Sequence, residues 1–165
     1  MSYNARIYVG YQIYISFFLA IALPIYSWDS IYVIAPKAKI LFYNGSMDQI
    51  KLLPLSSYPL QVPFSMTWVS FCLGVWDDQM VKIIFPLIFL CFVVIYFEFL
   101  KLLTNVRWAL LGTVLLASSN LLTYHASIVY QDIFVMFYNM VSLILIFYGS
   151  IKKVYGGESV VGQWS

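Results

Sequence analysis

Long apolar stretches without charged residues alternate with short polar segments along the chain. A helix needs about 20 apolar residues to cross the hydrocarbon core of a bilayer, so these stretches are candidate spans. They cover residues 7–28, 52–76, 83–97, 108–131 and 133–151. The pattern predicts an all-α integral membrane bundle with four or five spans.

The second stretch differs from the others because prolines interrupt its first half. Pro54, Pro59 and Pro63 are unsuited to a helix interior. The remainder, 64–76, gives only about 20 Å of helix against a hydrocarbon core of roughly 30 Å. Its aromatic residues fall on one face, which is typical of a helix lying in the membrane interface. We therefore predict spans at about 7–28, 80–100, 106–127 and 132–151, an external loop at 29–79 and a cytoplasmic tail at 152–165.

The positive charges orient this four-span arrangement. Cytoplasmic segments carry an excess of Lys and Arg, which places both termini in the cytoplasm. The cations on that side are then Arg6, Lys101, Arg107, Lys152 and Lys153. A five-span arrangement with the N-terminus outside places seven cations inside and two outside, so charge counting leaves it open. The short, proline-broken second stretch favours four spans.

Composition narrows the class of protein. Apolar residues make up 62% of the 165 residues and charged residues 10%, against roughly 25% in an ordinary soluble domain. A small soluble fold cannot bury that much apolar surface, and disordered chains are poor in aromatic residues. The net charge of +2 includes no basic run, which excludes nucleic-acid binding. The lipid bilayer, expected to be the plasma membrane, is therefore the first partner.

Two aspartates stand where apolar stretches end or begin. Asp29 follows the first stretch and either caps the helix expected at 31–44 or serves as a carboxylate of an external cavity. Asp132 separates the last two stretches, and either caps the fourth span or lies at the outer mouth of the bundle. In the four-span arrangement both are external, where paired carboxylates could hold a divalent cation or share acid–base chemistry. With five spans they lie on opposite sides.

Other polar residues near these aspartates each have two possible roles, one structural and one functional. His125 lies in the outer turn before Asp132, and is either a hydrogen-bonded interfacial residue or part of a site. Lys37 and Lys39 follow Asp29, and either bind a lipid phosphate or extend to water. The sequence contains no phosphate-binding loop, zinc-protease motif or nucleophile elbow, which argues against a nucleotide-driven pump or a soluble-type hydrolase.

Three short segments in a fixed order carry a family resemblance. They are Trp28-Asp29-Ser30 after the first span, Tyr58-Pro59-Leu60 before an apolar helix, and Tyr130-Gln131-Asp132 before the last span. Their order over residues 7–150 resembles the N-terminal part of polytopic glycosyltransferases of the GT-C fold. That family includes the protein mannosyltransferase and lipid A aminoarabinose transferase relatives.

The resemblance implies a function and a role for each candidate. The donor would be a polyprenyl-phosphate-linked sugar, and the acceptor a glycan, lipid or protein outside the cytoplasm. Asp29 would act as general base, and Asp132 would position the acceptor or a divalent cation. Lys37 or Lys39 would stabilise the departing phosphate. Tyr58, which stands where many relatives have His or an acidic residue, and His125 would contact substrate.

The length of the chain leaves a second function open. The family usually has seven to thirteen spans, so four spans imply part of a split or longer enzyme that needs its remainder as a partner. The alternative is a small non-catalytic membrane protein that acts as an assembly partner or scaffold. In that case the many aromatic residues would serve helix packing and anchoring at the membrane surface.

Overall fold

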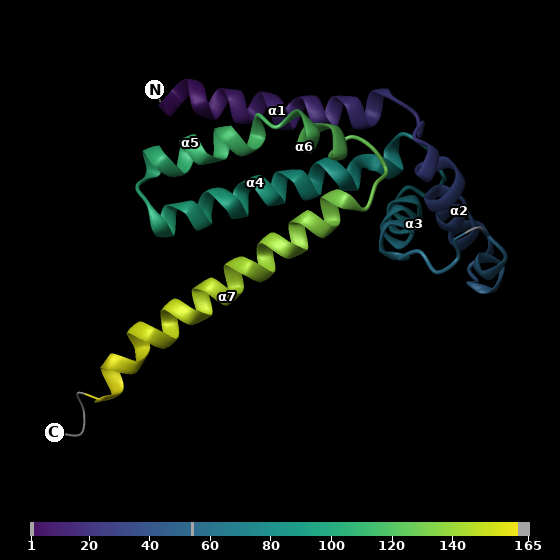
Figure 1. Cartoon of the computed structure of the whole chain (residues 1–165). Helices are drawn as coiled ribbons and strands as arrows, with labels where there is room; N and C mark the ends of the chain where they lie inside the picture. Colours follow the sequence, from purple (N-terminus) through teal and green to yellow (C-terminus); the bar gives the residue numbers. More distant parts are fainter. Residues whose placement is uncertain (1, 54, 162–165) are drawn as a thin grey trace.

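The computed structural model describes residues 2–53 and 55–161, and this part of the chain is all-helical, without strands. The first long helical segments lie side by side with alternating direction, whereas the last one runs away from them at an angle (Figure 1). In chain order these segments are α1 (Ser2–Ala22), α4 (Ile84–Leu103), α5 (Val106–Ala117) followed by the short α6 (Asn120–His125), and α7 (Asp132–Val161). The prediction of an all-α bundle is confirmed for the described residues.

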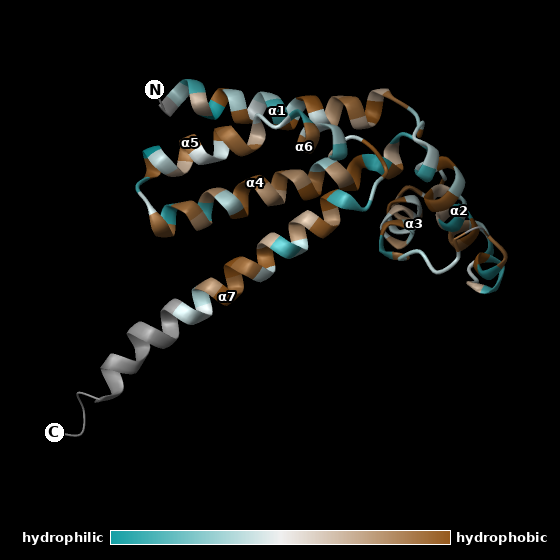
Figure 2. Ribbon diagram, in the orientation of Figure 1, coloured by the Kyte–Doolittle hydropathy of each residue, from teal (hydrophilic) through white to brown (hydrophobic). Residues whose placement is uncertain are grey.

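Three helices are long and apolar enough to cross a membrane. They are Tyr3–Ala22, Met80–Leu103 and Asp132–Ser150. No more than 28% of the apolar window of any of them is buried inside the protein, so most of their side chains face outward. Figure 2 shows hydrophobic residues along all the long helices. Outward-facing apolar surface of this length is typical of helices that contact lipid.

The predicted span at 106–127 is not one helix. α5 ends at Ala117, two serines follow, and α6 begins at Asn120. The Ser118 hydroxyl donates to the Leu115 carbonyl at 2.8 Å, a local bond that competes with a continuing helix. The 12 residues of α5 give only about 18 Å of helix. Three helices are therefore long and apolar enough to span a membrane, whereas a fourth crossing would need α5 and α6 together.

Two other predicted boundaries differ from the structure. α1 ends at Ala22 rather than near residue 28, because Leu23 precedes Pro24 and a residue before proline is disfavoured in a helix. α7 continues past residue 151, the predicted end of the last span, to Val161. The predicted tail at 152–165 is thus helical as far as the structure describes it, and residues 162–165 lie outside the described residues.

The segment between α1 and α4 folds into short helices at one end of the bundle. It contains a π-helix, η1 (Ser30–Ile34), then α2 (Ala35–Asn44), a 3-10 helix, η2 (Asp48–Leu52), α3 (Gln61–Leu73) and a second 3-10 helix, η3 (Met80–Ile83). α2 packs against α3, and α3 runs across the direction of the long helices rather than beside them (Figure 1).

Glycines end both α2 and α3. Gly45 and Gly74 have φ of +62° and +71°, a conformation that glycine adopts without steric cost, and each terminates its helix. α3 buries Val62 and Met66, whereas Phe64, Trp68 and Phe71 stay exposed, in keeping with the apolar face predicted for a helix in the membrane interface.

The core lies where α4 meets α7 and the short helices. Phe85 and Phe89 of α4 are fully buried, and the rings of Phe85 and Phe134 meet edge to face at 5.6 Å. Lys82 of η3 is also buried, and its ammonium donates to the carbonyls of Leu23 and Pro24. These bonds satisfy two carbonyls that lie beyond the end of α1 and fix the start of α4 against that end.

Close packing of α4 on α5 predicts a sensitive position. A Cβ added at Gly112 would lie 2.6 Å from a terminal methyl of Leu100. Leu100 can move away from one methyl group, but the two γ-carbons of valine need the same space. We expect Gly112→Val to lower the free energy of unfolding by about 1–3 kcal/mol. Denaturant titration in detergent micelles measures this change.

Gly10→Val in α1 is the matched control, because an added Cβ there meets nothing within 4 Å. Both substitutions replace a helical glycine by valine, so their intrinsic helix propensities change equally. Equal destabilisation by the two variants would contradict close packing at Gly112.

Candidate functional site

Two segments that are far apart in the sequence meet at the end of the bundle that carries α2 and α3. They are the segment 26–30, which follows α1, and the segment 124–132, which leads into α7. The buried hydroxyl of Ser30 donates to the Val129 carbonyl at 2.6 Å. The Ser27 hydroxyl in turn contacts that of Ser30. This buried contact fixes the residues beside Asp29 against the turn beside Asp132.

Asp29 and Asp132 both act on the same side chain, Tyr130. Burial is the largest cause that raises the pKa of the Tyr130 phenol, and the negative charge of Asp29 is the next. Asp132 raises this pKa further, whereas the Ser27 hydroxyl lowers it. A carboxylate disfavours a phenolate because like charges repel, and in water this repulsion is screened over about 10 Å. Both predicted aspartates therefore influence one phenol, and the Ser30–Val129 hydrogen bond is the contact that joins their segments.

His125 joins this group through Asp132. Its Nδ1 lies 3.3 Å from Oδ2 of Asp132, and the imidazole is 18% exposed against 59% for the carboxylate. The buried Nδ1 nevertheless makes no hydrogen bond of acceptable angle. An unsatisfied buried nitrogen is costly, and catalytic contacts often tighten only when substrate binds. A small movement of the exposed Asp132 would complete the pair.

Aromatic rings enclose the imidazole and extend the group. Tyr124 and Tyr130 meet the His125 ring edge to face, with centroid separations of 5.6 and 5.9 Å. Burial is the main cause that raises the pKa of Tyr26, and the neighbouring Tyr124 raises it further. We call these residues together the aspartate–tyrosine cluster: Tyr26, Asp29, Tyr124, His125, Tyr130 and Asp132.

The backbone at Asp29 leaves its carboxylate free of a capping role. Asp29 precedes η1 with helical dihedral angles, φ −60° and ψ −34°, and its side chain accepts no capping hydrogen bond. η1 is a π-helix, a rare form that frequently occurs at functional sites. The sequence left two roles open for Asp29, and the geometry does not support the first of them, the helix cap.

Lys37 and Tyr58 also lie close together, but Lys37 is buried. Lys37 of α2 is 1% exposed, and its ammonium donates to the Leu55 carbonyl at 2.5 Å and lies 5.7 Å from the centre of the Tyr58 ring. Gln131 donates to the Pro59 carbonyl at 3.1 Å. Lys37 thus holds the 55–58 segment on α2, and Gln131 fixes the next residue beside Asp132.

The buried ammonium gives Lys37 a testable effect on stability. Burial lowers the pKa of Lys37 below its ordinary value of 10.5, so above the lowered pKa the folded chain binds fewer protons than the unfolded one. Stability therefore rises with pH in the window below 10.5. We expect the free energy of unfolding of the wild type, relative to Lys37→Met, to rise as the pH approaches 10.5.

Denaturant titrations at a series of pH values measure this difference. Lys51→Met is the control, because Lys51 is an exposed lysine of η2 and its loss should leave the pH profile unchanged. A constant difference between wild type and Lys37→Met over this window would contradict the burial of the Lys37 ammonium.

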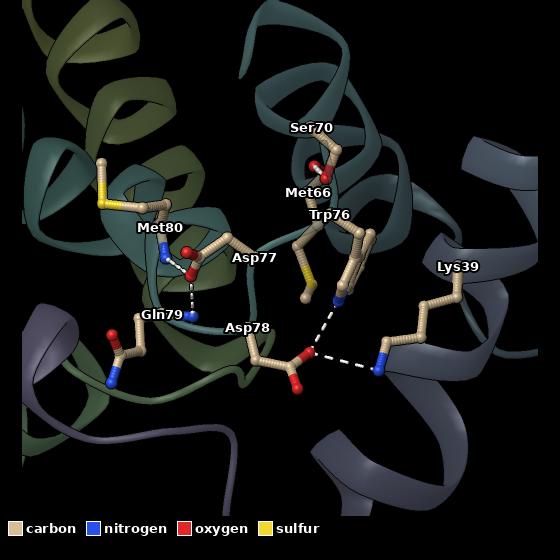
Figure 3. A network of polar contacts seen from close by, with 8 residues as sticks. All are labelled: Lys39, Met66, Ser70, Trp76, Asp77, Asp78, Gln79 and Met80. Atoms are coloured by element: carbon tan, nitrogen blue, oxygen red, sulfur yellow. Dashed lines mark hydrogen bonds and ion pairs between the residues drawn. The ribbon is translucent and has the colours of Figure 1, made fainter. Parts of the chain in front are cut away.

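Lys39 takes part in a different contact, which Figure 3 shows. Its ammonium lies 3.2 Å from Oδ1 of Asp78 and 5.3 Å from the centre of the Trp76 ring. The same oxygen accepts a 2.6 Å hydrogen bond from Trp76. The Asp77 carboxylate accepts hydrogen bonds from the backbone N–H groups of Met80 and Gln79 at the start of η3, and these bonds lower the pKa of its carboxyl. Lys39 therefore fixes α2 to the segment between α3 and η3.

The structure does not assemble a three-ligand cation site from Asp29, His125 and Asp132. Among the side chains that the structure describes, no three His, Cys, Asp or Glu residues come together in a way that could hold a metal ion. Mg²⁺ is often bound by one or two carboxylates together with substrate phosphates and water. The divalent cation predicted at Asp29 and Asp132 stays a prediction.

The sequence singled out the carboxylates and the imidazole of this cluster as candidates, but not its three tyrosines. Their signal was their position, since each lies within a few residues of Asp29 or Asp132. No protein-family model, curated protein or solved structure matches the chain. The side chains of the cluster are therefore the basis for assigning a function.

Proposed function

We propose that the chain is a glycosyltransferase module. It transfers a sugar from a polyprenyl-phosphate-linked donor to a glycan, lipid or protein acceptor on the extracytoplasmic side of the membrane. The observation that carries the proposal is the buried hydrogen bond from Ser30 to Val129, which joins the segment of Asp29 to the segment that leads to Asp132, at one end of a bundle of apolar helices. The order of sequence elements that resembles the GT-C family supports it independently.

Asp29 is the general base in this mechanism. Its carboxylate takes the proton of the acceptor hydroxyl, whose oxygen forms a bond to the anomeric carbon of the sugar. The bond from that carbon to the phosphate oxygen breaks, and polyprenyl phosphate leaves with the electron pair. Asp132, with His125 3.3 Å away, positions the acceptor.

The departing phosphate needs a positive charge. Lys39 is the more accessible of the two predicted lysines, because its side chain is 42% exposed whereas Lys37 is buried under the 55–58 segment, and it would leave Asp78 to meet the phosphate. A divalent cation between the carboxylates and the phosphate would supply the same stabilisation. The remainder of a longer or split enzyme would contribute further contacts to the donor lipid.

A transfer assay tests the proposal. Membranes that contain the chain receive polyprenyl phosphate carrying a tritium-labelled hexose, and matched membranes receive the labelled nucleotide sugar with its conversion to lipid blocked. We expect label to move to acceptor only from the lipid-linked donor. Transfer that does not exceed the level of membranes lacking the chain would overturn the proposal. Stable co-purification of an active membrane enzyme in that case would favour the scaffold alternative.

A further inference from the structure

A second site lies at the opposite end of the bundle from the aspartate–tyrosine cluster. There α1, α4 and α5 enclose an open groove of about 290 Å³. The groove is bounded by the N-terminal half of α1, the C-terminal half of α4 and α5 (Figure 1). Its lining residues are Arg6, Val9, Ile13, Val93, Val94, Phe97, Leu110 and Thr113.

The neutral side chains that line this groove are mostly apolar and offer an occupant no free hydrogen-bond donor. Thr113 is the one neutral polar residue in the lining, and its hydroxyl already donates to the Ala109 carbonyl at 2.8 Å. It therefore offers no free donor to an occupant. An occupant that buries surface here gains mainly from the removal of apolar area from water or from disordered lipid, which suits a hydrocarbon chain.

Arg6 supplies the only charge in the lining, and it stands at the depth of a membrane surface. It precedes the end of α1 by 16 residues, or about 24 Å of helix, close to the thickness of the hydrocarbon core. Nearby, Lys101 is paired with Glu98 at 2.9 Å. Within the described side chains, Arg6 has no ion-pair partner.

We propose that this groove binds one anionic phospholipid. The Arg6 guanidinium holds the phosphate, for which its fork of N–H donors is well suited, and one acyl chain lies along the groove. An anionic lipid fits better than a zwitterionic one, because the head group of the latter carries its own cation beside the phosphate. This inference does not depend on the proposed sugar transfer.

Native mass spectrometry of the detergent-purified chain tests the site. The probes are phosphatidylglycerol and phosphatidylcholine of the same acyl composition. We expect the wild type to retain phosphatidylglycerol, and Arg6→Gln to weaken this retention about tenfold, the effect of losing one charge-assisted contact. Arg107→Gln removes the same charge at the same end but from a residue outside the groove, and should leave retention unchanged.

Val94→Trp tests the groove itself without changing charge. Val94 is 50% exposed, so a larger side chain fills the groove without entering the core. We expect this variant also to lose phosphatidylglycerol, while its far-UV circular dichroism stays that of the wild type. Equal retention of the two lipids by the wild type, equal losses in Arg6→Gln and Arg107→Gln, or full retention by Val94→Trp would each overturn the proposal.

Discussion

Replacing Asp29 by asparagine is expected to lower sugar transfer by about 10²–10⁴-fold, the usual contribution of a well-placed general base. Asparagine keeps the shape of the side chain but cannot take the proton of an acceptor hydroxyl. The variant should fold normally, because the Asp29 side chain makes no capping hydrogen bond and the segment is fixed by Ser30 and Val129. Initial rates of label transfer from the polyprenyl-phosphate donor measure the loss.

Asp48→Asn is the matched control for this experiment. Asp48 is an exposed carboxylate of η2, in the same segment between α1 and α4 as Asp29 but outside the aspartate–tyrosine cluster. Its replacement should leave the rate unchanged. If Asp29→Asn kept the wild-type rate, or if both variants lost activity to the same extent, Asp29 would not be the base.

The sequence predicts the long apolar helices well, because their signal is local composition. Helix ends that depend on a single hydrogen bond or a single residue are harder to predict from the sequence. Pro24 stops α1 six residues before its apolar stretch ends, and the hydroxyl of Ser118 joins in ending α5. A hydropathy window averages over such positions, so it reports one continuous stretch where the chain forms two helices.

The same holds for the candidate site: residues with a local sequence signal could be predicted, whereas contacts between residues far apart in the sequence could not. Asp29 and Asp132 could be predicted because a carboxylate at the end of an apolar stretch is costly and stands out. The bond from Ser30 to Val129 joins residues 99 positions apart, and no local pattern announces it. Lysine side chains are usually exposed, yet the 55–58 segment folds over Lys37 and buries it.

The largest expected difference between the possible topologies is in the labelling of single cysteines, which reports the side of the membrane on which each residue lies. The native Cys72 and Cys91 are exposed and are first replaced by alanine. A cysteine at Met47, between α2 and η2, and one at Gln131, beside the cluster, should then both react with a membrane-impermeant maleimide in intact cells. A cysteine at Thr104, in the turn between α4 and α5 at the other end of the bundle, should react only after permeabilisation.

This outcome follows if the chain crosses the membrane four times with α3 on the outer surface. Met47 and Gln131 then share one side, as do the segments of Asp29 and Asp132, which the Ser30–Val129 hydrogen bond joins. With five crossings, the segment around 64–76 would pass through the bilayer, and the cysteines at 47 and 131 would react from opposite sides. Such a result would separate the two aspartates by the thickness of the membrane, and shared chemistry between them would be impossible.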